Sequence, residues 1–422
     1  CAAIPVGAER PQGLASAPLA DTLCALQSSA SRAAADVPGS AESEDAQYAT
    51  EHESAQALAL TRSSAEPLPH TLLDKLRPTS EPTSRFYVYP ELDWLSMTCD
   101  GVPIEKVIAN TSYLNKFPKH SDDYLFIKRA LEHPLRTDDP EKAEIFVVPS
   151  LFNVITQQLT KLHKTPYKSC CVKGICNAAL YHQVEVMLSN SQWYNRSAGR
   201  DHVLVNSHWD HERSVDAYFK RINNCSSISF EENSLRGGRC RVASTYVGRP
   251  CKSAKRKGFA FSMVASMAHE NNFPDRVKTC ELLSRAEGKD PQRFSVSICG
   301  TGEQCPALAV SKFGFHAKGD TWGSNRVMDT MLSRSVPAFT AEEQFDVLPP
   351  FVPWRDLSVM VHIDDEERFM EDLDTAMGQY EEKIAMVQKW IPLIDWERSG
   401  GAFDRYMSFF EQCIESELHW DP

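Results

Sequence analysis

Residues 312–329 have the sequence KFGFHAKGDTWGSNRVMD, which combines the end of a strand, a polar turn and the start of a helix. The first two residues close the predicted strand, Gly319 and Gly323 flank the turn, and Ser324 has a side chain suited to a helix N-cap. The expected buried face of the helix consists of Val327, Met328, Met331 and Leu332. A strand, a turn and a helix in this order form the basic unit of an α/β fold.

The turn before this helix predicts an anion site. Backbone N–H groups at a helix start lack intrahelical partners and lie at the positive end of the helix dipole. Arg326 adds a side chain that can bind a phosphate through two hydrogen bonds, and Asp329 can accept a ribose hydroxyl. The dipole contributes about 0.3–1 kcal/mol and a positioned donor about 3–4 kcal/mol, so Arg326 should matter more. An ordinary capped helix with a solvated arginine and acid explains the same residues equally well.

The alternation of strands and helices extends along most of the chain. Strands are expected at 86–89, 145–149, 202–205, 258–265, 293–299, 336–340 and 357–363, and helices from 121, at 178–193, at 274–285, from 324 and from 365. A polar, cysteine-bearing stretch at 223–257 divides this series. Such alternation predicts parallel sheets covered on both faces. We therefore expect an α/β fold with Rossmann-like domains at 84–250 and 255–398 and a C-terminal helix at 399–422.

The first 80 residues have a different composition. They are rich in Ala, Ser, Glu and Pro, which predicts a disordered stalk or linker over residues 1–80. No run of 18 or more apolar residues occurs anywhere in the chain. Because the sequence begins at Cys1 rather than Met, we expect a signal or membrane anchor upstream of residue 1.

Charge and cysteine content limit the class of protein. Hydrophobic residues make up 42% of the chain and the net charge is −12, which argues against a nucleic-acid binder but not against a locally positive pocket. Thirteen cysteines favour disulfides over free thiols or zinc, because paired Cys-x2-Cys motifs are missing from the sequence. Together with glycosylation triplets at Asn110, Asn195 and Asn224, they favour the secretory pathway.

Four blocks, spread over residues 85–395, resemble the exostosin family, glycosyltransferase family 47. The first three are Tyr87-Val88-Tyr89-Pro90, the run RTDDPEKAEIFVVP at 136–149, and Gly199-Arg200-Asp201-His202 followed by Ser207-His208-Trp209-Asp210. The fourth comprises Lys312-Phe313, Gly319-Asp320, Ser324-x-Arg326, Asp329, Val336-Pro337, Leu348-Pro349, Phe351 and Trp354. The order of the blocks makes the resemblance specific.

Four positions depart from the family pattern. The family usually has Cys where Gly314 stands, Gly-Cys where Arg334-Ser335 stand, and Glu where Asp329 stands. These changes leave open an altered donor, a looser pocket or a lost activity.

The resemblance implies a GT-B transferase with two Rossmann-like domains facing a central cleft. The acceptor lies on the N-terminal domain and a UDP-sugar on the C-terminal one, held by Lys312, Gly319, Ser324, Arg326 and Asp329, with Trp354 closing the pocket. The reaction inverts the anomeric centre, transfers a sugar to a glycan or glycoprotein hydroxyl, and requires no metal or other cofactor. The implied location is the Golgi lumen, as a type II membrane protein, and homo- or hetero-oligomerisation stays open.

An inverting displacement needs a base for the acceptor hydroxyl. His208 and Asp210 are the candidates, because they follow the carboxyl end of a predicted strand, whereas Asp201 and His202 precede it and are expected to be structural. Trp209 either stacks on a sugar or packs in the core. The basic run from Arg249 to Lys257 either binds an acidic glycan or forms a solvated loop.

Two other functions compete with the transferase. The departures at Gly314 and Arg334 allow a catalytically silent exostosin-like subunit that binds glycan or stabilises a partner. An unrelated Rossmann enzyme such as a dehydrogenase is disfavoured, because no G-x-G-x-x-G turn follows the strands at 86–89 and 258–265.

Overall fold

The computed structural model describes residues 81–109, 118–159, 167–211, 219–235, 239–248, 250–251, 257–267 and 273–418. The predicted stalk and the triplet at Asn110 lie outside these described residues. So does the basic run from Arg249 to Lys257, apart from its last residue and the stretch at 250–251. The chain divides between Glu66 and Pro67, and every described residue belongs to the part that begins at Pro67.

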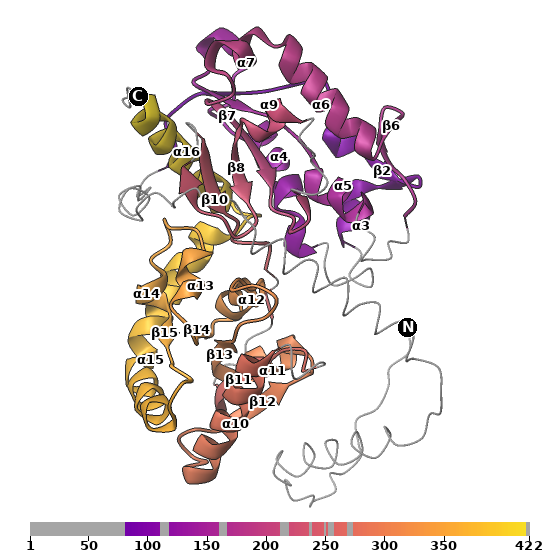
Figure 1. Cartoon of the computed structure of the whole chain (residues 1–422). Coiled ribbons are helices and arrows are strands. Elements are labelled where there is room, and N and C mark those ends of the chain that lie inside the picture. Colours follow the sequence, from indigo (N-terminus) through magenta and orange to yellow (C-terminus); the bar gives the residue numbers. More distant parts are fainter. Residues whose placement is uncertain are drawn as a thin grey trace, which may run out of the picture. The chain divides into compact units, whose positions relative to one another are not determined.

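The first sheet has six strands in the spatial order β1-β4-β7-β8-β10-β9 (Figure 1). The strands are β1 (Phe86–Val88), β4 (Ile145–Val147), β7 (His202–Asn206), β8 (Ser226–Ser229), β9 (Ser234–Leu235) and β10 (Cys240–Ala243). All pair in parallel except β9, which is antiparallel to β10. The predicted strands at 86–89, 145–149 and 202–205 are confirmed. Strands β8 and β10 occupy the stretch that was predicted only as a polar divide.

Helices of the first half are α4 (Asp122–Glu132), α5 (Phe152–Leu159), α6 (Ala178–Asn190), α7 (Gln192–Ser197) and α9 (Lys220–Asn223). The helix predicted at 178–193 is broken at Ser191, whose hydroxyl accepts a hydrogen bond from Tyr194 N and so caps α7. A small antiparallel sheet of β2 (Thr98–Cys99), β3 (Val102–Pro103), β5 (Cys170–Val172) and β6 (Ile175–Cys176) lies beside α3 (Ile104–Ala109).

The second sheet is entirely parallel, in the order β12-β11-β13-β14-β15. Its strands are β11 (Phe259–Val264), β12 (Val296–Gly300), β13 (Ser311–His316), β14 (Val336–Phe339) and β15 (Val359–Met360). Its helices are α10 (Pro274–Lys289), α11 (Gln304–Val310), α12 (Arg326–Leu332), α13 (Glu343–Asp346), α14 (Trp354–Leu357) and α15 (Glu366–Ile394). The prediction that a strand ends at Phe313 was wrong, because β13 continues to His316 at the carboxyl edge of the sheet.

The last helix, α16 (Ala402–Leu418), returns to the first half of the chain, where it packs against α4 and β10. A disulfide joins Cys413 on this helix to Cys240 on β10. The hydroxyl of Tyr406 donates to Ala243 O at 2.8 Å and accepts from Thr245 N at 2.7 Å. The C-terminal helix therefore adds to the core of the first half, and its Tyr406 and Phe409 also pack against Phe351 of the second half.

The prediction of disulfides is confirmed. Among the described residues the bonds are Cys99–Cys170, Cys171–Cys176, Cys240–Cys413, Cys251–Cys305 and Cys280–Cys299, while Cys225 carries a buried free thiol. One parallel and one mainly parallel sheet, connected by helices, confirm the predicted α/β fold class. None of the described helices is both long enough and apolar enough to cross a membrane.

Candidate functional site

Two arginines meet at the carboxyl edge of the second sheet. Arg326 begins α12 after β13, and Arg276 lies in the first turn of α10 after β11. Because β11 and β13 are neighbouring parallel strands, the segments that follow them leave the sheet at the same edge. Burial, and then the guanidinium of Arg276, lower the pKa of Arg326 to about 10, while Asp329 and Asp320 oppose this shift.

Arg276 is held tightly, yet its hydrogen bonding is incomplete. Only 7% of its surface is exposed. Its Nη1 donates to Ser266 O at 3.0 Å, and its Cζ lies 4.0 Å from the centre of the Phe273 ring. Its Nη2 lies against Gly319, where a Cβ atom would overlap with it. Its Nε has no hydrogen-bond partner among the described residues, so the buried guanidinium can still donate to an anion.

The structure brings together four of the five predicted donor-binding residues. Gly319 contacts Arg276, and Asp329 lies one helical turn beyond Arg326. The N-cap of α12 is Asn325 and not, as predicted from the sequence, Ser324. The hydroxyl of Ser324 accepts a hydrogen bond from Arg326 N at 3.3 Å. Since α12 has seven residues, its dipole adds little, and the two side-chain charges dominate.

Lys312 and Trp354 lie elsewhere. Lys312 is near the start of β13, with its Nζ 5.1 Å from the centre of the Tyr380 ring, so the structure does not bring it to the arginines. Trp354 is 4% exposed and donates from Nε1 to Pro349 O at 2.9 Å, which makes it part of the core of the second half.

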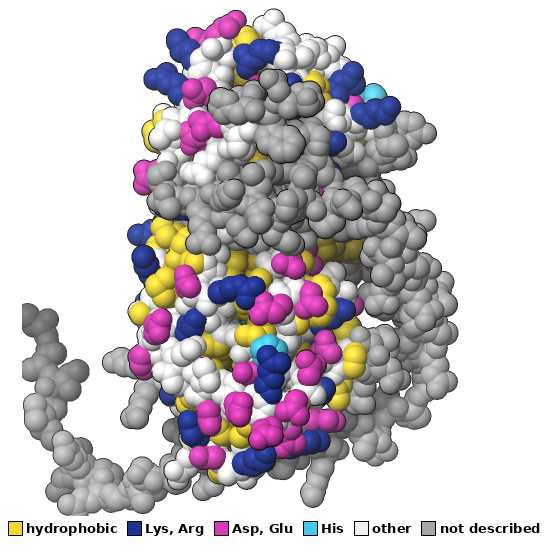
Figure 2. Space-filling model, turned by 60° about the vertical axis from the view of Figure 1, so that its left-hand side comes forward, with side chains coloured by type: hydrophobic (Ala, Val, Ile, Leu, Met, Phe, Trp, Pro, Cys, Tyr) yellow, Lys and Arg dark blue, Asp and Glu magenta, His cyan; other side chains and the backbone are white. Residues whose placement is uncertain are grey.

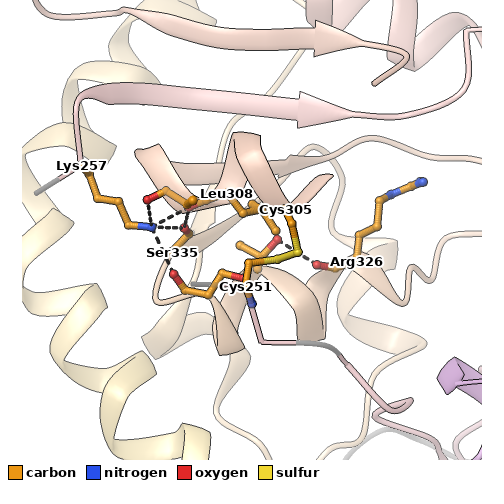
Figure 3. The surroundings of a disulfide bond; sticks show 9 residues. Cys251, Lys257, Cys305, Leu308, Arg326 and Ser335 are labelled. Carbon is orange, nitrogen blue, oxygen red and sulfur yellow. Dashed lines mark hydrogen bonds between the residues drawn. A yellow bond between two sulfur atoms is a disulfide. The ribbon is translucent and has the colours of Figure 1, made fainter. Parts of the chain in front are cut away.

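The departures from the family pattern fit their surroundings. A Cβ atom at Gly314 would lie 2.8 Å from Thr330 Oγ1, so Thr330 fills the space next to this glycine. Ser335 donates to Ser311 O at 2.9 Å and accepts from Lys257 Nζ at 3.3 Å. In Figure 3 this lysine lies beside the Cys251–Cys305 disulfide, and the guanidinium of Arg326 points away from it. Burial lowers the pKa of Lys257 to about 8.

The predicted bases, His208 and Asp210, follow β7 at the carboxyl edge of the first sheet. His208 is 1% exposed, and both of its ring nitrogens form hydrogen bonds. Nδ1 accepts from Asp210 N at 3.1 Å, and Nε2 contacts Gln157 Oε1 at 3.0 Å. His208 would have to break its bond to Gln157 before its Nε2 could take a proton from an acceptor. Trp209 is half-buried, with its ring 5.5 Å from that of His208.

A buried acidic pair next to this edge was not predicted from the sequence. Asp122 and Asp123 are fully buried at the start of α4, and burial raises the pKa of both carboxyls. Asp122 accepts from Asn153 Nδ2 at 2.8 Å and from Ser244 Oγ at 2.6 Å. Asp123 accepts from Asn153 N at 3.0 Å. Their partners come from other elements, so no local sequence pattern indicates the pair.

Contacts connect the predicted base to the turn before α12. The ring of His208 lies 5.0 Å from that of His120, which lies 5.7 Å from Tyr246. The Tyr246 hydroxyl donates to Glu231 Oε1 at 3.1 Å, and Thr321 Oγ1 donates to the same oxygen at 2.9 Å. Residues from the two sheets therefore form one continuous polar region.

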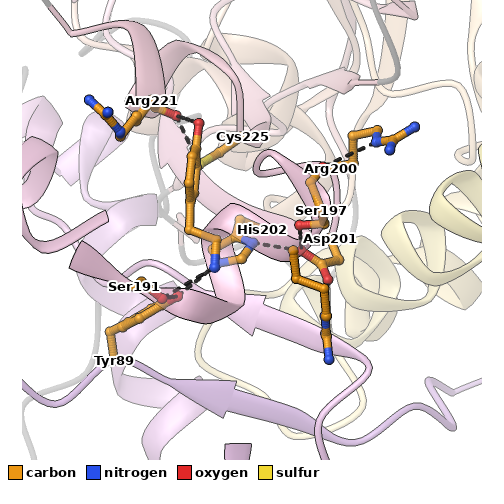
Figure 4. A network of polar contacts seen from close by, with 10 residues as sticks. Tyr89, Ser191, Ser197, Arg200, Asp201, His202, Arg221 and Cys225 are labelled. Carbon is orange, nitrogen blue, oxygen red and sulfur yellow. Dashed lines mark hydrogen bonds and ion pairs between the residues drawn. The ribbon is translucent and has the colours of Figure 1, made fainter. Parts of the chain in front are cut away.

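Asp201 and His202 form a separate network at the opposite edge of the first sheet (Figure 4). His202 contacts Asp201 Oδ1 through Nδ1 at 2.7 Å and Tyr89 OH through Nε2 at 2.8 Å. The imidazole is fully buried, and this burial lowers its pKa. The contacts agree with the structural role expected from the sequence.

Sequence reasoning missed Arg276 and Glu231. Arg276 could have been found, because it begins a predicted helix that follows a predicted strand, the position where α/β sheets bind ligands. Glu231 follows β8 in the same way, but that strand is the serine-rich segment SSIS, which lacks a hydrophobic pattern.

A parallel sheet with two arginines at its carboxyl edge, joined to a second, mainly parallel sheet, defines a two-sheet α/β protein with a candidate anion site. The chain belongs to the exostosin family, since the sequence profile of the Exostosin GT47 domain matches residues 105–374.

Comparison with curated proteins finds a relative with low sequence identity. The chain is 22% identical over 257 residues to the "Probable xyloglucan galactosyltransferase GT17" of Arabidopsis thaliana, and the match covers 51% of each chain. The chain thus spans about half the length of this relative.

Solved structures give only remote likenesses. The GtfA/B complex matches with a TM-score of 0.34, 10% identity and coverage of 59% of this chain and 63% of that one. TarM matches with a TM-score of 0.32, 9% identity and coverage of 58% and 59%. At these TM-scores the likenesses say nothing about the site.

Proposed function

We propose that the chain is an inverting glycosyltransferase that moves a sugar from a UDP-sugar to a hydroxyl of a glycan or glycoprotein. The observation that supports this most is the pair of arginines, Arg276 and Arg326, at the carboxyl edge of the second sheet. A leaving UDP develops negative charge, and two fixed guanidinium groups stabilise such charge without the need for a metal ion. Gly319 lets Arg276 approach the turn, and the proposed role of Asp329, one helical turn beyond Arg326, is to accept a ribose hydroxyl.

The galactosyltransferase relative makes UDP-galactose the first donor to test. The Golgi lumen is the proposed compartment, in agreement with five disulfides among the described residues. The surface also suits a glycan-modifying enzyme better than a nucleic-acid binder. Figure 2 shows Asp and Glu side chains interspersed with Lys and Arg over the visible face, without one continuous basic field.

Thermal unfolding in the presence of UDP, GDP and CMP tests the donor. A ligand that binds only the folded state raises the unfolding temperature, so UDP should stabilise the protein more than GDP or CMP does. Absence of any shift at millimolar nucleotide would exclude the enzyme and favour the silent subunit.

Substitution of His208 and Asp210 by Ala, one at a time, tests the base. One of the two variants should lose about 10²–10⁴-fold in turnover while it still binds UDP, because a general base contributes to chemistry and not to donor affinity. Full activity in both variants would place the base elsewhere.

A further inference from the structure

We propose that Glu231 is a positioning residue: it holds the donor turn, residues 319–325, in the shape that binds the nucleotide. The inference rests on the proposed donor site. It makes donor affinity depend on a side chain from the first sheet, because Glu231 follows β8 whereas the donor turn follows β13.

The carboxylate of Glu231 is a direct partner of the donor turn. Its Oε1 accepts from Thr321 Oγ1 at 2.9 Å, and the backbone N–H of Gly323 also donates to this carboxylate. Tyr246 fixes the same oxygen from the first half of the chain through its hydroxyl, at 3.1 Å. The carboxylate therefore holds two residues of the donor turn, Thr321 and Gly323, in a fixed position relative to Tyr246.

The backbone and the neighbouring glycine are adapted to this contact. Glu231 has a φ of 49°, a left-handed conformation that costs free energy in a residue with a Cβ atom and is found more often at functional sites. The carboxylate oxygen lies so close to Gly323 that a Cβ atom there would overlap with it. The close approach of the Glu231 carboxylate therefore explains the glycine at position 323, whose own backbone conformation does not call for one.

The contact has a consequence for the donor. Because Gly323 N–H and Thr321 Oγ1 already donate to Glu231, these two donors are not available to phosphate oxygens, and the proposed phosphate contacts rest on Arg276 and Arg326. Gly319, in the same turn, lies against Arg276. A shift of the donor turn would therefore move Gly319 relative to the guanidinium of Arg276 and change the geometry of the proposed phosphate site.

The test combines UDP affinity, measured by calorimetry on the full chain, with UDP release from UDP-galactose and the unfolding temperature. Glu231→Ala should raise the Kd for UDP about tenfold, the effect of losing one charge-assisted hydrogen bond. Glu231→Gln keeps an acceptor oxygen in place and should restore most of this affinity. Glu232→Ala is the matched control, since Glu232 pairs with Arg241 at 2.9 Å, and it should leave the Kd unchanged.

Gly323→Ala completes a double-mutant cycle. Alone it should also weaken UDP binding about tenfold, whereas in the Glu231→Ala background it should add less than about threefold, because the overlap has been removed. If the Kd of the double variant is raised by the product of the two single fold-changes, Glu231 and Gly323 act independently and the proposed coupling is wrong. An unchanged Kd in Glu231→Ala with a lower unfolding temperature would reduce Glu231 to a stability residue.

A large loss of UDP release in Glu231→Gln with normal UDP affinity would also overturn the positioning role, because it would make the carboxylate part of the chemistry. Failure of the wild type to bind UDP would remove the proposed function itself. Normal UDP binding by Glu231→Ala, with wild-type binding intact, would remove only this inference.

Discussion

The carboxyl edges of the two sheets differ in how their polar groups are satisfied. On the second sheet, burial and then the guanidinium of Arg276 lower the pKa of Arg326, and Nε of Arg276 has no partner among the described residues. On the first sheet, Asp122 and Asp123 are fully buried, and Asn153 and Ser244 donate to them at 2.6–3.0 Å. We propose that an external anion completes the hydrogen bonds at the second edge, whereas the acids at the first edge are already paired.

The carboxyl edges of two similar parallel sheets therefore differ in their roles. Buried polar groups that satisfy one another stabilise a unique arrangement, so the first edge is a rigid support. Buried charges that lack a partner cost stability and are often retained where a ligand repays that cost, so we propose the second edge as the binding site. Substitutions at the two edges should therefore separate binding from stability.

The largest expected effect is on binding at the second edge. Arg326→Ala and Arg276→Met should each weaken UDP binding about 100-fold, close to 3 kcal/mol, because each removes charge-assisted hydrogen bonds to phosphate. The unfolding free energy should hardly change, since each substitution also relieves repulsion between the guanidinium groups. Calorimetry and urea unfolding measure the two quantities. Arg285→Ala, on α10 but exposed and paired with Glu366, is the control and should leave affinity unchanged.

Normal UDP binding by both arginine variants would show that the second edge is not the phosphate site. A loss of stability as large as the loss of affinity would show instead that the arginines support the fold, and the contrast between the two edges would disappear.

The second-largest expected effect is a loss of unfolding free energy when Asp122, at the carboxyl edge of the first sheet, is replaced. Asp122→Ala removes the acceptor of two buried donors and should lower the unfolding free energy by about 3 kcal/mol, with UDP affinity unchanged. Asp138→Ala provides the control, because this carboxylate is exposed and its pair with Arg136 should contribute under about 1 kcal/mol. Urea unfolding that gives equal stabilities for the two variants would contradict the assignment of Asp122 to a supporting network.

Local patterns predicted the elements whose side chains are apolar, and failed where polar groups are buried. Strands β1, β4, β7, β11 and β14 were found because their hydrophobic runs end at turn residues. Strand β8 was missed because Ser226, Ser227 and Ser229 are buried in it, and serine carries no burial signal. Arg326 was found from its place in the first turn of a predicted helix, and the family motif strengthened that interpretation. Glu231 was not, because its role depends on contacts with a turn far away in the sequence.

A smaller effect is expected from pH. Burial lowers the pKa of His316 to about 3, whereas in the unfolded chain the imidazole protonates near 6.5. Between these values the unfolded state binds more protons, so stability falls as the pH decreases from 6.5 toward 3, by up to about 1.4 kcal/mol per pH unit. His316→Asn should reduce this slope, measured by urea unfolding between pH 7 and 5. His182→Asn, on the exposed face of α6, should not.

The smallest effect concerns the end of α12, where the family has glycine and this chain has Arg334. The residue has a φ of 55°, and its N–H donates to Met331 O at 2.8 Å, which is the geometry in which helices usually end on glycine. Arg334→Gly should therefore raise the unfolding free energy by about 0.5–1 kcal/mol, partly offset by the larger entropy of the unfolded chain. Lys128→Gly, at an exposed position inside α4, should lower it by about 1 kcal/mol. If Arg334→Gly leaves UDP affinity unchanged while it stabilises the protein, this departure alters helix termination alone, and the arginine pair at the other end of α12 is unaffected by it.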